Sequence, residues 1–178
     1  MKKTLASFAL LGCLFIIASC GSKGKNGVTY KDARQYNDYI VNKQMALQKR
    51  FEAATASLAS VSNADEMKAG ATKLIQSIDS TLPSVDKDIV DVQGMPDWNG
   101  DTAMRGAAVQ LFTFYHSVLD KDLRDMGNLL AKGADFSTAD QQKMEEINTR
   151  INTSESKLDD QFRTAQKQFA TKNKLVLY

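Results

Sequence analysis

The chain has 178 residues, of which 43% are hydrophobic and 25% charged, and its formal net charge is +2. Apart from Lys2 and Lys3, its 21 basic residues balance its 21 acidic residues, so the chain from Cys20 onward is neutral. A neutral domain lacks the basic surface with which proteins bind nucleic acids, and a chain of this length holds one domain with its own core.

The N-terminus has the pattern of a secretory signal peptide. Lys2 and Lys3 precede an apolar run at residues 5–17, which is too short to span a bilayer but has the length typical of a signal peptide. The run ends in Ile17-Ala18-Ser19-Cys20, which resembles the lipobox of bacterial lipoproteins. The resemblance implies that residues 1–19 are removed and that Cys20 is lipidated, with palmitate among its acyl chains. A signal peptide that is cut without lipidation is the alternative interpretation.

The layout of the chain resembles lipoproteins of the Bacteroidota and spirochaetes that have no assigned activity. The resemblance is carried by the lipobox, by the glycines and lysines that follow it, and by Tyr36-Asn37-Asp38-Tyr39-Ile40-Val41 at the opening of a long helix. In lipoproteins of the Bacteroidota, export to the cell surface follows a rule that requires acidic residues just after the lipidated cysteine. In this chain Gly21-Ser22-Lys23 is basic instead. The resemblance therefore implies a lipid anchor in the outer membrane that faces the periplasm, with the cell surface as the alternative location.

Residues 20–28 are predicted to contain the lipidated cysteine and a flexible tether. The tether is predicted because the segment is rich in glycine and lysine. The first helix is predicted to begin at Thr29, with Asp32 completing a capping box. Apolar residues then recur every seven residues, which is typical of a helix in a bundle. They are Ala33, Ile40, Leu47, Ala54 and Val61.

The second helix is predicted to begin after Ser62 or Asn63, either of which can cap it. Pro83 lies in its middle and removes one backbone hydrogen bond. The apolar residues on both sides of the proline stay in phase at 100° per residue, so the pattern predicts one kinked helix that ends at about residue 92.

The third helix is predicted to follow a loop at residues 93–100, with Asp101 as its cap and Gly133 as its C-terminal stop. Trp98 in the loop is predicted to cover the end of the bundle. Two neighbouring apolar stripes make this the most buried helix. They consist of Met104, Ala108, Leu111, Tyr115 and Val118, and of Phe112, Leu119, Leu123, Met126 and Leu130.

The fourth helix is predicted to run from a cap at Ser137 and Asp140 to about Asn173. Four helices of about 30 residues with short connections predict an all-α, antiparallel up-down four-helix bundle over residues 29–178. An even number of helices places the tether, the loop at 93–100 and the C-terminus at one end. Lys167, Lys172 and Lys174 would then join Lys23 and Lys25 near the bilayer.

The residues predict no metal, no cofactor and no enzyme activity. His116 is the single histidine, and it belongs to no Glu-x-x-His pair, so a di-iron centre is excluded. Haem held by His116 and a methionine such as Met45 or Met144 is the alternative to a structural histidine. No nucleophile has an adjacent base in a recognisable motif, and Asp97–Asp101 lacks the glycine and glutamate of a calcium loop.

Two functional hypotheses follow. The first is a non-enzymatic, membrane-anchored lipoprotein of the cell envelope that binds another envelope protein or a peptide. Tyr39 lies off the heptad stripe and is the candidate partner contact, with an isolated surface aromatic as the alternative. The second hypothesis is a carrier of a small ligand or cofactor in the interior of the bundle.

Overall fold

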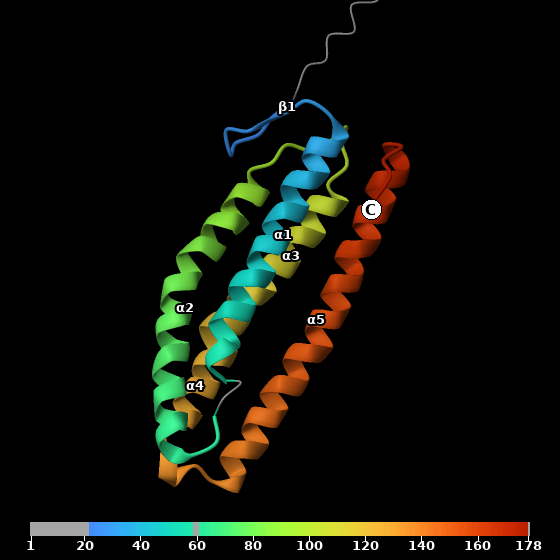
Figure 1. Ribbon diagram of the computed structural model, residues 1–178. Coiled ribbons are helices and arrows are strands. Elements are labelled where there is room, and N and C mark those ends of the chain that lie inside the picture. The colour runs from blue at the N-terminus through green and yellow to red at the C-terminus, as the bar shows by residue number, and fades with distance from the viewer. Residues whose placement is uncertain (1–21, 59–60, 178) are drawn as a thin grey trace, which may run out of the picture.

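The computed structural model describes residues 22–58 and 61–177. It confirms the predicted all-α, antiparallel up-down four-helix bundle (Figure 1). The helical elements are α1 (Ala33–Thr55), η1 (Ala56–Leu58), α2 (Ala64–Gln93), α3 (Ala103–Ser117), η2 (Val118–Leu123), α4 (Arg124–Leu130), η3 (Gly133–Asp135) and α5 (Thr138–Lys172). The third helix of the bundle consists of α3, the π-helical segment η2 and α4.

The predicted heptad stripe of α1 forms part of the core. Ile40, Leu47 and Ala54 are buried, and Tyr36, one turn before Ile40, is buried beside them. The stripe does not extend to Val61, because α1 ends at Thr55 and a short 3-10 turn follows. The first helix is therefore shorter than five heptads.

The second helix is continuous through Pro83, as predicted, and the ribbon of α2 bows gently around the core (Figure 1). Asn63 is its N-cap, and its side chain accepts hydrogen bonds from the backbone N–H groups of Asp65 and Glu66. Glu66 in turn accepts from the backbone N–H of Ser62 at 2.8 Å. These bonds satisfy donors that the first helical turn leaves unpaired.

The π-helical segment explains why the third helix carries two apolar stripes. A π turn inserts an extra residue, which rotates the following residues by about 100° about the axis. The core face therefore passes from the stripe that ends at Val118 to the stripe that contains Leu119 and Leu123, and all three side chains are buried. Periodicity predicted both stripes but not the π turn between them.

The last helix has the predicted cap. Ser137 accepts a hydrogen bond from the backbone N–H of Asp140, and Asp140 accepts one from the backbone N–H of Ser137. The buried stripe of α5 is Ile147, Ile151, Phe162, Ala165 and Phe169. It packs mainly against α3, and α5 ends at the cap residue Asn173, as predicted.

The N-terminal segment differs from the sequence prediction. Ser22–Lys23 (β1) pairs antiparallel with Thr29–Tyr30 (β2), so the described part of the predicted flexible tether forms a hairpin. Thr29 lies in a strand and does not cap α1. Asp32 is the N-cap instead, and its side chain accepts from the backbone N–H of Gln35 at 2.8 Å.

One end of the bundle carries the β1–β2 hairpin, the α2–α3 loop and the C-terminus, as the up-down topology predicted (Figure 1). The connections at the other end are η1 with the residues that follow it, and η3. No helix among the described residues is long and apolar enough to cross a bilayer.

Candidate functional site

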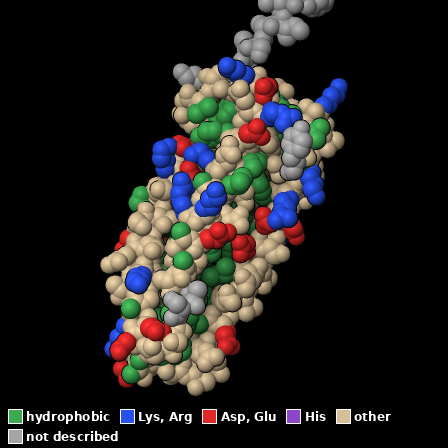
Figure 2. Space-filling model, viewed as in Figure 1, with side chains coloured by type: hydrophobic (Ala, Val, Ile, Leu, Met, Phe, Trp, Pro, Cys, Tyr) green, Lys and Arg blue, Asp and Glu red, His purple; other side chains and the backbone are tan. Residues whose placement is uncertain are grey.

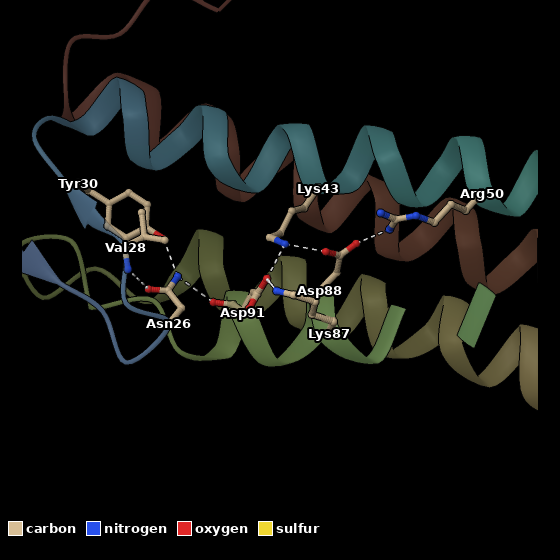
Figure 3. Close-up of polar contacts among 8 residues, drawn as sticks. All are labelled: Asn26, Val28, Tyr30, Lys43, Arg50, Lys87, Asp88 and Asp91. Atoms are coloured by element: carbon tan, nitrogen blue, oxygen red, sulfur yellow. Dashed lines mark hydrogen bonds and ion pairs between the residues drawn. The ribbon is translucent and has the colours of Figure 1, made fainter. Parts of the chain in front are cut away.

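Cys20, the predicted lipidation site, lies outside the described residues, which begin two positions later. The hairpin that follows is fixed to α2 by Asn26 (Figure 3). The Asn26 side-chain amide donates to the backbone carbonyl of Asp91 at 3.0 Å and to the Tyr30 hydroxyl at 2.7 Å. Its backbone N–H donates to the carbonyl of Gly94 at 3.3 Å. The segment that follows the predicted lipidation site is therefore attached to the end of the bundle.

A charge network joins α1 to α2 beside this hairpin (Figure 3). Asp88 is 5% exposed and accepts hydrogen bonds from Lys43 at 2.6 Å and from Arg50. Asp91 accepts from Lys43 at 2.8 Å and from Lys87 at 2.6 Å. Burial would lower the pKa of Lys43, but its hydrogen bonds to the two carboxylates outweigh burial and raise it. Every charge in the network has a partner, so its evident role is to hold the helices together.

Tyr39 is partly buried rather than freely exposed. Its ring contacts that of Tyr30 edge-on, with the centroids 5.5 Å apart. The Nζ atom of Lys43 lies 5.2 Å from the Tyr39 ring centroid. Tyr39 therefore helps to pack the hairpin against α1, and its contact with a partner stays a prediction.

His116 points from α3 toward α2, where its Nε2 atom lies 3.1 Å from a carboxylate oxygen of Asp86. The two methionines named as alternative haem ligands lie on other helices than His116. Met45 is half exposed on α1, and Met144 of α5 lines a groove to which His116 does not contribute. No group of three or more potential metal ligands occurs within the described ranges.

The seam between α1 and α5 is the open side of the bundle. α1 packs on α2 and α3, and α5 packs on α3 and α4, but α1 and α5 hardly touch each other. They meet near the hairpin end, where the Gln166 amide donates to Asn37 at 3.1 Å and the Tyr36 and Phe169 rings stack. Figure 2 shows hydrophobic side chains in a hollow along this seam, with acidic side chains beside it.

A polar cleft of about 320 Å³ lies in the seam. Its lining residues are Gln44, Gln48, Tyr115, Asn152, Glu155, Ser156, Asp159 and Arg163. Tyr115 is the most buried of them at 7% exposure, and its hydroxyl donates to Glu155 across the gap between α3 and α5. Burial, followed by this hydrogen bond and the charge of Glu155, raises the pKa of Tyr115. The hydroxyl therefore stays protonated and acts as a donor.

An apolar groove of about 560 Å³ lies at the far end of the bundle, away from the hairpin. Its apolar lining comes from η1, the segment after it, α2, α4, the loop before α5 and α5 itself. These apolar residues are Leu58, Val61, Met67, Met126, Leu130, Phe136 and Met144. Three of the seven are methionines, whose flexible side chains adapt to different apolar surfaces.

The remaining depressions on α5 are less informative. Two of them are lined by residues of α5 alone, on its polar outer face. They bring no side chains of a second element together, whereas the polar cleft and the apolar groove each combine several elements.

Sequence reasoning missed both the polar cleft in the seam and the apolar groove at the far end of the bundle. The signal was present in α5, where Asn152, Ser156, Asp159 and Arg163 recur at the three- and four-residue spacing of one helix face. On α1, Gln44 and Gln48 are also one turn apart. These two polar stripes form one cleft only because the fold places α1 and α5 opposite each other.

Comparisons with protein-family models, curated proteins and solved structures find no match for this chain.

Proposed function

We propose that this protein is a lipid-anchored, non-enzymatic lipoprotein of the bacterial cell envelope that binds another envelope protein or a peptide. The anchor is Cys20, in the sequence Ile17-Ala18-Ser19-Cys20. Two or three acyl chains on one cysteine give stable membrane residence, because each buried methylene contributes about 0.8 kcal/mol. The outer membrane, with the bundle in the periplasm, is the proposed location.

The open α1–α5 seam is the observation that supports a binding function. Because α1 and α5 hardly touch, this side of the bundle holds the polar cleft, and the apolar groove lies beside α5 at the end of the bundle away from the hairpin. A polypeptide partner can place apolar side chains against Met67, Met126 and Met144 and hydrogen-bond to the side-chain amides of the cleft.

We assign the cleft no catalytic step. The Tyr115 hydroxyl donates a hydrogen bond to Glu155, and its raised pKa keeps it un-ionised at neutral pH. Asp159 pairs with Arg163 at 2.8 Å along α5. These groups are therefore placed for recognition by hydrogen bonds.

A small apolar ligand in the groove is the second candidate, because a volume of about 560 Å³ falls within the range of small-molecule sites. In this case the protein would carry a ligand at the end of the bundle that lies away from Cys20.

Photo-crosslinking in cells tests the binding function. A photoreactive residue is placed at Met144 in the groove and, as the matched control, at Thr153 on the exposed outer face of α5. The proposal expects one dominant protein adduct at Met144 and none at Thr153. A small-molecule adduct at Met144 would favour the carrier, and equal labelling at both positions would refute a site in the groove.

Cell fractionation tests the anchor independently of the partner. Cys20→Ala is expected to move the protein from the detergent phase to the aqueous phase of a membrane extract. Retention of the variant in the detergent phase would contradict anchoring through Cys20.

A further inference from the structure

The hairpin leaves little chain between the proposed anchor and the folded body. Only Gly21 separates Cys20 from Ser22, the first residue of β1. Two extended residues span about 7 Å, so a lipidated Cys20 would hold the hairpin directly at the headgroups. This step rests on the proposed function.

The hairpin is connected to the C-terminus through the α2–α3 loop. Asn26 binds the loop at the carbonyl of Gly94. At the other end of the loop, the Trp98 indole N–H donates to Asn173 at 3.0 Å, and Asp101 pairs with Lys172 at 2.8 Å. An anchor that holds the hairpin at a bilayer therefore turns the end of the bundle that carries the C-terminal tail toward the same surface (Figure 1).

The tail has the chemistry of a membrane-interface segment. Leu175 packs against the core, while Val176 and Leu177 are 61% and 38% exposed. Lys174 is exposed and, like Lys25 in the hairpin, has no ion pair with another described residue. Exposed apolar side chains gain free energy when they enter the membrane interface, and each lysine near an anionic lipid surface adds about 1 kcal/mol of attraction.

We infer that residues 172–177 and Lys25 form a second membrane contact, which binds anionic lipid headgroups and holds the bundle upright on the bilayer. The polar cleft and the apolar groove then lie progressively farther from the membrane. A partner would reach the groove at the end of the bundle that faces away from the bilayer.

The single tryptophan and the single remaining cysteine allow a direct test. The chain from Cys20 onward is coupled through its thiol to a maleimide lipid, so the test does not depend on lipidation in cells. The vesicles contain phosphatidylcholine and phosphatidylglycerol with brominated acyl chains, which quench nearby indole fluorescence. Trp98 is expected to be quenched, and the quenching is expected to be clearly weaker in the variant Lys174→Gln/Leu177→Asp, which stays coupled through Cys20 but lacks the second contact.

The matched control is Lys143→Gln/Met45→Asp, which makes the same kinds of change at exposed positions away from the tail. It is expected to retain the quenching. For the uncoupled chain, Lys174→Gln is expected to weaken binding to the same vesicles about five-fold. Equal quenching in the two variants, or no quenching of Trp98 in the coupled protein, would overturn the inference. An unmodified Cys20 in cells would refute the anchor but not this surface.

Discussion

Replacing Asp88 with alanine removes the carboxylate that joins α1 to α2. Asp88 comes from α2, and its side chain is 7% exposed between two cations of α1. Lys43 donates to one carboxylate oxygen at 2.6 Å, and Arg50 donates to the other. Asp88→Ala therefore removes two charge-assisted hydrogen bonds from a largely buried site.

The expected loss follows from what each cation can do afterwards. A hydrogen bond to a charged group contributes about 1.5–3 kcal/mol to the free energy of unfolding. Lys43 keeps Asp91 as a partner at 2.8 Å, and Arg50 is 37% exposed and can turn toward water, so neither charge is left stranded. We therefore expect a loss of about 2–3 kcal/mol, which corresponds to about 4–12 °C in Tm for a domain of this size.

Urea and thermal unfolding of the soluble chain from residue 20 measure this loss. Asp86→Ala is the matched control, because Asp86 lies two residues earlier on α2, is 62% exposed and pairs only with His116 among the described residues. A surface pair of this kind is worth about 0–1 kcal/mol. Equal unfolding midpoints for the two variants would refute the assignment of the Asp88 network as a stabilising contact.

Three further predictions concern the core, a turn and pH. Ile147→Asp places an unpaired charge at a position with 6% exposure, so it is expected to cost several kcal/mol, and an unchanged Tm would remove Ile147 from the core. Gly133→Ala should lower the free energy of unfolding by about 1–2 kcal/mol, because the backbone φ of Gly133 is +57° and the new Cβ would meet the Lys68 side chain. Gly106→Ala, at an open position inside a helix, is the control and should be neutral or stabilising. Equal effects of the two substitutions in urea unfolding would contradict this. Hydrogen bonding to Lys132 and Ser137 lowers the pKa of Asp140 to about 2, so its contribution to the free energy of unfolding should be complete above about pH 5 and decline as the pH falls toward 2. Asp140→Asn should therefore cost much less stability at pH 2 than at pH 6, and an equal loss at the two pH values would be inconsistent with this.

The helices could be predicted because their signals are local and repeated. Ile40, Leu47 and Ala54 recur in α1 at the heptad spacing, and all three are buried. The residues around Pro83 stay in phase, and α2 is continuous. A helix face is defined within one segment, so the sequence of that segment is sufficient to find it.

The hairpin and the open seam depend on contacts between distant residues. Asn26 binds the carbonyl of Asp91, 65 positions away, and this contact has no pattern in the neighbouring sequence. Each hairpin strand has two residues, which is too short for an alternating pattern to be recognised. The polar cleft likewise requires Gln48 of α1 and Glu155 of α5 to face one another, and periodicity alone does not pair one helix with another.

Mass spectrometry of the N-terminal peptide from the membrane fraction tests the central claim most directly. The proposed function predicts that the chain begins at Cys20 and that this residue carries the added mass of its acyl chains, with the modification absent from Cys20→Ala. A mature chain with a free Cys20 thiol, or one that begins after Cys20, would contradict the lipid anchor.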